Sequence, residues 1–168
     1  MIDYGMRPGP HTVGGYIAAG TSGAVTGAAS GGIVASKPPW LNLAETKTFK
    51  FGIYKGRYAS EDLIRYRAGD SAAQYWTGRF WSTDVPISAS QVRAEKAIPV
   101  RWRGSDQVNV LDTVYEANIP KGIVIYEGRV AAQVGADGDY YPGGTNQTFI
   151  DYADLDCLEK RGSWSLKP

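Results

Sequence analysis

The amino-acid sequence predicts an α+β fold, built on a twisted, mainly antiparallel β-sheet with two or three short helices. Three observations predict this class. Runs of alternating, β-branched and aromatic residues recur along the chain and are separated by Gly, Pro and Asn. The helical segments are few, short and early. A chain of 168 residues that is 43% hydrophobic is long enough for one domain with a core of its own.

The first 40 residues differ in composition from the rest. From Pro8 to Ser36 only His11 can carry a charge, and the segment is rich in Gly, Ala and Ser. Gly, Ser and Thr interrupt it too often for a membrane span, and the basic region of a signal peptide is missing. It reads either as a flexible leader or as a segment that helps the protein load into a delivery device. We therefore predict a leader over residues 1–40 and a folded domain over residues 41–168.

The first elements of this domain are predicted from short patterns. Residues 48–54 alternate as in a strand, residues 59–67 read as a short helix ending near Gly69, and residues 80–82 read as a short strand. Ser88 and Gln91 have the spacing of a capping box, which predicts a helix over residues 88–97 that stops before Pro99.

The second half of the domain reads mainly as strands. Residues 108–118 and 122–134 are predicted strands divided by Pro120, and residues 147–152 form another. Residues 155–160 are predicted to be a terminal turn or helix.

Composition limits the chemistry that the chain can perform. The net charge of +1 gives no bulk electrostatic case for nucleic acid or an anionic membrane. One cysteine, Cys157, excludes an internal disulfide and a Cys-based zinc cluster, and one histidine, His11, argues against histidine catalysis and His-rich metal sites. We expect no metal and no cofactor. Catalysis would use carboxylates, arginines, amides and hydroxyls.

The turn at residues 141–150 is the most informative local feature. Gly143 and Gly144 let the backbone turn tightly and approach another molecule closely. Gln147 then places an amide where the turn meets a predicted strand, which suits a ligand site. An ordinary hairpin loop is the alternative.

Arginines and carboxylates supply the remaining candidates. Guanidinium groups bind phosphate oxygens in bidentate fashion, so a set of them suits a pyrophosphate; the set is Arg65, Arg67, Arg79 and Arg93. Each could instead pair with a local acid such as Asp62, Asp70 or Glu95. A strand carboxylate could stabilise an oxocarbenium ion, and the candidates are Glu116, Glu127 and Asp151.

Read in order, these segments resemble the NAD glycohydrolase toxin family typified by the tuberculosis necrotizing toxin, and the small NADase effectors of bacterial type VI secretion. The resemblance covers about residues 48–152. Its features are an Arg–aromatic pair, a Gly-Arg-Phe-x-Ser segment, an arginine before an Ile-Pro step, a Tyr-Glu strand followed by Pro and Gly, and a Gly-Gly-x-x-Gln turn. In this sequence they are Arg65 and Tyr66, residues 78–82, Arg93 with Ile98 and Pro99, Tyr115 and Glu116 with Pro120 and Gly122, and residues 143–147.

The resemblance implies cleavage of NAD+ or NADP+ at the nicotinamide–ribose bond, with the dinucleotide as substrate. It implies functional roles for Arg65, Arg93 and Gln147. We assign the two arginines to the pyrophosphate, and Gln147 to the nicotinamide ribose or the attacking water. The substrate-binding candidates are Tyr66, Tyr75, Arg79, Phe80, Trp81, Ser82, Thr113, Glu116, Gly143 and Gly144. The family has a histidine at the position of Thr113.

The resemblance further implies a secreted effector that is delivered to the cytoplasm of a target cell, in contact with a secretion apparatus, and held inactive in its producer by an immunity protein. Two rival classes stay open. An ADP-ribosyltransferase toxin breaks the same bond, although Thr148 and Phe149 follow Gln147 where such enzymes carry Gln-x-Glu. A non-catalytic binding or structural module of a phage or secretion apparatus would suit the Gly-rich leader.

Overall fold

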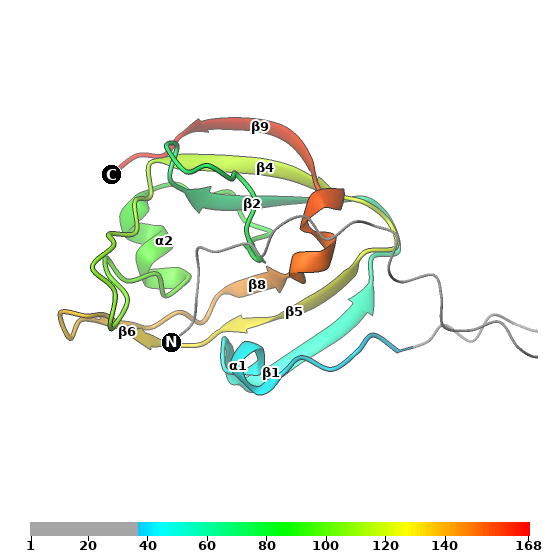
Figure 1. Cartoon of the computed structure of the whole chain (residues 1–168), viewed down its shortest axis with the longest axis horizontal. Helices are drawn as coiled ribbons and strands as arrows, with labels where there is room; N and C mark the ends of the chain where they lie inside the picture. The colour runs from blue at the N-terminus through cyan, green and yellow to red at the C-terminus, as the bar shows by residue number, and fades with distance from the viewer. Residues whose placement is uncertain (1–36) are drawn as a thin grey trace, which may run out of the picture. The chain divides into compact units, whose positions relative to one another are not determined.

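The computed structural model describes residues 37–168, which form one compact unit (Figure 1). It confirms the α+β class: antiparallel strands dominate, with three short helices. The predicted leader lies mostly outside the described residues, so its boundary near residue 40 stays a prediction.

The strands form two main sheets, drawn as two layers in Figure 1. The four-stranded sheet has the order β1-β5-β8-β3, and the three-stranded sheet has the order β2-β4-β9. A small hairpin, β6–β7, lies apart from both. The bounds are β1 Phe49–Tyr58, β2 Leu63–Gly69, β3 Phe80–Trp81, β4 Thr113–Ile119, β5 Val124–Val130, β6 Gln133–Val134, β7 Tyr140–Tyr141, β8 Asn146–Phe149 and β9 Glu159–Ser165.

The two sheets are joined where β3 ends. The backbone N–H of Tyr66 donates to the carbonyl of Ser82 at 2.9 Å, and the N–H of Ser82 donates back to Tyr66 at 2.8 Å. The largest core cluster lies on the faces that the sheets turn toward each other. It consists of Trp81, Tyr115, Ala117, Ile119, Ile125, Ile150, Leu155 and Leu158. We call this side of both sheets the inner face.

A separate hydrophobic cluster packs on the outer face of each sheet. Helix α2 (Ala89–Glu95) places Val92 against Ala68, Val114 and Leu166 of the three-stranded sheet. Phe49 packs with Tyr126 and Phe149 on the outer face of the four-stranded sheet, beside the short helix α1 (Leu43–Thr46). The 3-10 helix η1 (Tyr152–Cys157) supplies Leu155 to the inner core.

One sequence prediction is wrong in kind. Residues 59–67 were expected to form a helix, but residues 63–69 form strand β2, which pairs with β4 from Leu63↔Ile119 to Gly69↔Thr113. The alternation of Leu63, Arg65 and Arg67 with Ile64, Tyr66 and Ala68 is a two-residue period. Pairing with β4 outweighs any local helical preference.

A second prediction is corrected at the C-terminus. Helix η1 begins three residues earlier than expected, because the Asp151 side chain accepts a hydrogen bond from the Ala153 N–H and caps it. Residues 159–160, expected to end a terminal turn or helix, instead open strand β9. Strand β9 completes the three-stranded sheet by pairing with β4.

The other predicted elements are confirmed with shifted ends. The strand at 48–54 is β1, which extends to Tyr58, and the helix at 88–97 is α2, which ends at Glu95. Ser88 caps α2 by accepting from the Gln91 N–H at 3.2 Å, whereas the Gln91 side chain accepts from Ile87 rather than from Ser88. The strand expected over 108–118 is β4 and begins only at Thr113; that over 122–134 is β5 and β6; that over 147–152 is β8.

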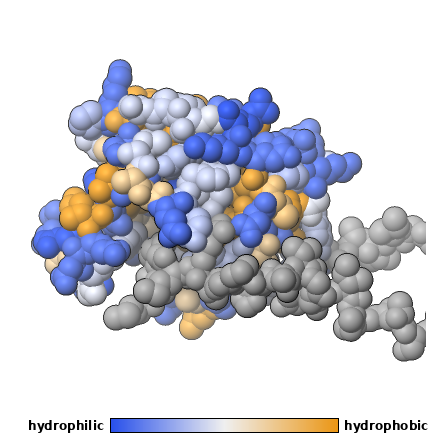
Figure 2. All heavy atoms as spheres, turned by 45° about the horizontal axis from the view of Figure 1, so that its top comes forward, coloured by the Kyte–Doolittle hydropathy of each residue, from blue (hydrophilic) through white to orange (hydrophobic). Residues whose placement is uncertain are grey.

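The face of the molecule in Figure 2 is mostly hydrophilic, with hydrophobic residues in separate patches. Within residues 37–168, no helix combines the length and the apolar character needed to cross a membrane.

Candidate functional site

A charged cluster lies on the inner face, between the two sheets. Arg65 Nη2 donates to Glu127 Oε1 at 3.0 Å, and Arg57 Nε donates to Glu127 Oε2 at 2.9 Å. Arg65 also donates through Nε to Thr148 Oγ1 at 3.1 Å and through Nη1 to the carbonyl of Ile64 at 2.9 Å. We call Arg57, Arg65, Glu127 and Thr148 the Arg–Glu cluster. It links three strands of one sheet to β2 of the other.

Strand register brings these four residues together. Glu127 and Thr148 are direct partners across β5 and β8, so their side chains share a face. Arg65 stands opposite Ala117 on β4, and this small neighbour leaves the guanidinium room to reach the other sheet. The cluster therefore depends on two separate pairings made by segments far apart in the sequence.

The electrostatics of the cluster keep Glu127 ionised. Burial by itself would raise the pKa of the Glu127 carboxyl, but hydrogen bonds and charges from Arg57 and Arg65 outweigh it and lower that pKa below its usual value. The Glu127 side chain is 29% exposed, whereas that of Arg65 is 10% exposed. Glu127 is therefore a fixed anion that remains partly exposed.

Arg67 lies on the same face of β2, two residues further along. Its Nη1 donates to the carbonyl of Trp76 at 3.3 Å, and no ion pair is found for it within residues 37–168. The backbone of Gly69 and Gly78 lies against its guanidinium. Desolvation by burial lowers the pKa of Arg67.

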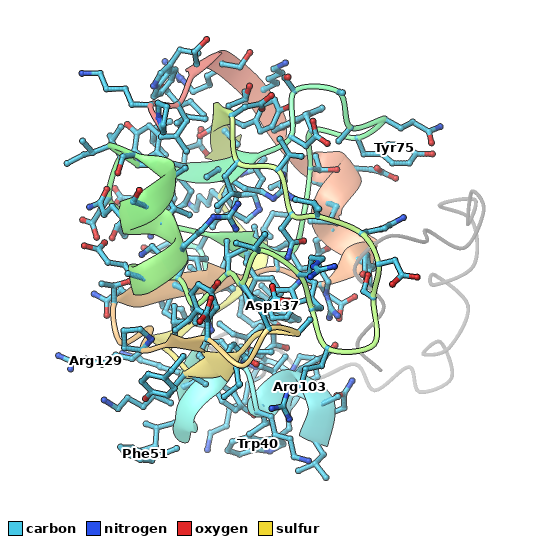
Figure 3. All side chains as sticks on the ribbon, turned by 90° about the vertical axis from the view of Figure 1, so that its left-hand side faces the viewer. Trp40, Phe51, Tyr75, Arg103, Arg129 and Asp137 are labelled. Atoms are coloured by element: carbon cyan, nitrogen blue, oxygen red, sulfur yellow. The ribbon has the colours of Figure 1, made fainter. Side chains whose placement is uncertain are left out.

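Aromatic side chains surround this end of the inner face. The Trp76 ring lies 6.4 Å from Tyr115 and 6.0 Å from Trp81, measured between ring centroids. The Tyr115 hydroxyl donates to the carbonyl of Asp70 at 2.9 Å. Tyr75 extends outward near the end of its loop and is 44% exposed (Figure 3). Trp76 and Tyr75 are thus better placed to meet a ligand than Trp81, which is 2% exposed.

Gln147 lies on the other side of β8 from the Arg–Glu cluster. It alternates with Thr148 along the strand and shares the outer face with Phe149. Its side chain is buried, and Nε2 donates to the carbonyl of Thr48 at 2.9 Å. The structure does not bring Gln147 and Arg65 into contact. Gln147 fastens the segment that leads into β1.

The Gly-Gly turn packs against the end of α2. Gly143 and Gly144 have φ angles of 60° and 93°, which favour glycine. The Gly143 N–H donates to the carbonyl of Ala94 at 2.9 Å, and Thr145 Oγ1 donates to the backbone carbonyl of Glu95 at 2.8 Å. Both glycines therefore serve a turn that joins β7, β8 and α2.

Arg93 is held by backbone carbonyls. Its Nη2 donates to Asn109 at 2.7 Å and its Nη1 to Ile98 at 3.4 Å. These bonds tie α2 to the loop that follows it. Arg93 and Arg65 lie on separate elements, with separate partners.

Arg79 and Phe80 belong to the outer face of the four-stranded sheet. The Arg79 guanidinium lies 4.2 Å from the Phe149 ring centroid and 4.3 Å from that of Tyr152, and it pairs with Glu45 and, at 3.7 Å, with Asp151. Phe80 packs on Phe149 with 5.3 Å between centroids. Arg79 thus forms ion pairs, as the alternative for each arginine proposes, but its partners Glu45 and Asp151 are distant in sequence and are not the local acids named there.

The remaining predicted residues lie at other places in the fold. Trp81 is core, and Ser82 and Tyr66 form the bridge between the sheets. Thr113 begins β4, and Glu116 pairs with Arg161 at 3.2 Å on the outer face of that strand. Of the residues to which the resemblance gives a role, only Arg65 belongs to the Arg–Glu cluster.

Glu127 and Arg67 are candidates from the sequence that the resemblance does not select, whereas Arg57 and Thr148 are not predicted from the sequence at all. The signal for Arg67 was the i, i+2 spacing with Arg65, which places both on one face only if the segment is a strand. Arg57 and Thr148 carry no such local signal, because the pairing that recruits them is long-range. Among the described residues, no group of His, Cys, Asp and Glu is arranged to hold a metal ion.

Comparison with known proteins finds a similar fold among solved structures but no match among family models or curated proteins. A chain in the solved structure of Tne2 in complex with Tni2 is 14% identical with a TM-score of 0.54, and the match covers 68% of this chain and 93% of that one. A chain of Rhs1-CT in complex with its cognate immunity protein RhsI1 is 11% identical with a TM-score of 0.41, covering 68% and 83%. The first likeness shows a shared fold, and the second is too low to carry an argument.

Proposed function

We propose that this protein is an NAD(P)+ glycohydrolase toxin that uses the inner face around the Arg–Glu cluster. One observation carries the proposal: Glu127 is held ionised by Arg57 and Arg65 yet remains partly exposed. The ordered series of motifs supports the same activity, because it resembles NAD glycohydrolase toxins over residues 48–152. The fold shared with a chain of the Tne2–Tni2 complex is consistent with it.

The reaction suits this set of residues. Nicotinamide leaves NAD+ with the bonding pair of the broken C–N bond and becomes neutral, so no general acid is needed. Positive charge develops on the ribose, and water then adds to C1′ and loses a proton. An ionised carboxylate fixed near the ribose stabilises that charge, as preorganised groups do in other enzymes. Glu127 is the carboxylate that we assign to this role.

The arginines would serve the substrate's phosphates while they orient Glu127. Arg65 makes three hydrogen bonds within the protein and has further N–H groups to offer. Arg93 would reach a phosphate only by giving up its bonds to backbone carbonyls. We therefore place Arg65 nearer to the chemistry than Arg93, and Gln147 acts on the site through the position of β8.

A Glu127→Gln variant tests the assignment. The amide keeps the size and some hydrogen bonding of the carboxylate but loses its charge, so nicotinamide release should fall about 10²–10³-fold. Glu61→Gln is the matched control, because Glu61 is exposed and precedes β2. Unchanged turnover in a correctly folded Glu127→Gln protein would remove Glu127 from the reaction.

The biological setting follows from the same resemblance. We propose that the protein is an effector that acts in the cytoplasm of a target cell, and that its producer makes a cognate immunity protein. Expression of the chain from a tightly controlled promoter in bacteria should lower total NAD+ before viability falls. Growth arrest at steady NAD+ would contradict the proposed activity and favour another toxic mechanism.

A further inference from the structure

We propose that Arg67 binds a phosphate group of the dinucleotide, beside the Arg–Glu cluster. This inference rests on the proposed function and extends it to a residue that the motif series does not select. The reasons are the position of Arg67 on β2, its lack of a carboxylate partner among the described residues, and the glycines and aromatic rings around it.

Position places Arg67 next to the proposed chemistry. Arg65 and Arg67 are two residues apart on one strand, so their side chains project from the same face, roughly 6–7 Å apart along β2. Arg65 contacts Glu127 directly. A substrate whose ribose lies near Glu127 would therefore bring its neighbouring phosphates toward Arg67.

Charge distinguishes the two arginines. Arg65 shares the carboxylate of Glu127 with Arg57, whereas Arg67 has one hydrogen bond, at 3.3 Å to a backbone carbonyl, and no carboxylate within ion-pair distance in residues 37–168. A guanidinium group has five N–H donors in a planar fork that matches phosphate oxygens. Arg67 thus retains donors and a positive charge for an anionic ligand.

The surroundings of Arg67 favour a charged ligand. A Cβ atom added at Gly78 would lie 2.5 Å from Arg67 Nε, and one added at Gly69 would lie 2.7 Å from Nη1. Only glycine at these positions lets the guanidinium lie where it does. Desolvation lowers the pKa of Arg67, and the same low-dielectric surroundings strengthen its attraction for a phosphate.

A purely structural role explains this arrangement less well. Enclosing a cation without a carboxylate partner is unfavourable, and one long hydrogen bond returns little of the desolvation cost. Proteins retain such unfavourable groups where function requires them. Trp76, whose backbone carbonyl accepts the Arg67 hydrogen bond, is only partly buried, so its ring would contact the nucleotide beside the phosphates.

The experiment compares the full chain with Arg67→Leu and Arg67→Lys. Arg101→Leu is the control, since Arg101 pairs with Asp137 on the exposed surface. Binding of ADP-ribose is measured by thermal shift and by titration calorimetry at constant ionic strength, with adenosine as a ligand that has no phosphate. Initial rates of nicotinamide release give kcat and KM for NAD+.

Arg67→Leu should keep or raise the melting temperature and weaken ADP-ribose binding about 10- to 100-fold, as expected for a lost charged hydrogen bond. KM should rise more than kcat falls, and adenosine binding should not change. Arg67→Lys should bind ADP-ribose less tightly than wild type, because it lacks the bidentate fork.

Wild-type ADP-ribose affinity in either Arg67 variant would overturn the inference, and the lysine variant keeps the test decisive if the leucine variant fails to fold. Wild-type protein that binds ADP-ribose through Arg67 but releases no nicotinamide would support the phosphate site and contradict the proposed function alone.

Discussion

At the scale of single residues, Arg65 has a structural role and a role in the proposed site, and its structural role can be measured by substitution. It joins the sheets through Glu127 and Thr148 and stands in the proposed site. Arg65→Ala should lower the free energy of unfolding by about 1–3 kcal/mol, because it removes hydrogen bonds to a charged, partly buried partner. Arg65→Lys should recover part of that loss. Urea denaturation measures both, and an Arg65→Ala protein as stable as wild type would show that the link between sheets contributes nothing.

Gln147 carries a second prediction at this scale. The resemblance implies that Gln147→Ala loses activity, and the described contacts add that it also loses stability, about 1 kcal/mol, through its buried bond to the Thr48 carbonyl. The melting temperature and the rate of nicotinamide release should therefore both be lower in the variant than in wild type. Asn146→Ala is a suitable neighbour for comparison, because its side chain is exposed on the same strand. An unchanged melting temperature with lost activity would place Gln147 in the site rather than beneath it.

Glu127 predicts how stability depends on pH. Its pKa is lower in the folded protein than its ordinary value of about 4.3. The ion pairs therefore stabilise the fold above that ordinary value, and this stabilisation is lost as the pH falls through the lower, folded-state pKa. In Glu127→Gln the acid side of the stability profile should flatten. The test measures the free energy of unfolding between pH 3 and pH 6, a range that brackets the ordinary pKa of about 4.3. Parallel pH dependences for wild type and variant would contradict the assignment.

At the scale of elements, the turn before β8 gives a test of local geometry. A Cβ at Gly143 would lie 2.9 Å from the Val130 carbonyl oxygen and 3.0 Å from that of Ala131, at a φ of 60°. Gly104 has a φ of 77° with no atom within 4 Å of such a Cβ. Gly143→Ala should therefore destabilise the protein more than Gly104→Ala, whose cost is about 1 kcal/mol of backbone strain. Equal losses would show that the turn relaxes around the new methyl group.

The same scale shows how far the sequence could predict this structure. The Ser88 cap and the alternation of residues 48–54 are local signals, and both elements form where they predict. Strand β2 was mistaken for a helix because its identity is decided by pairing with residues 113–119, about fifty positions away. Strand β9 was missed for the same reason. The Arg–Glu cluster combines residues of β1, β2, β5 and β8, so no local sequence pattern predicts it.

At the scale of the whole molecule, the two sheets act as one support for the proposed site. The Tyr66–Ser82 bridge joins them at one edge, the apolar inner core packs between them, and the Arg–Glu cluster spans the space beside that core. A substrate bound there would be held by groups from both sheets. We therefore predict one reaction at this place, hydrolysis of the nicotinamide–ribose bond.

The most direct measurement is the product balance after the purified full chain is incubated with NAD+ and, separately, with NADP+. Nicotinamide and free ADP-ribose, or its 2′-phosphate form, should appear in equal amounts, with no label transferred to protein and with Glu127→Gln about 10²–10³-fold slower. Intact dinucleotide after long incubation would contradict the account, and so would ADP-ribose attached to protein in place of free ADP-ribose.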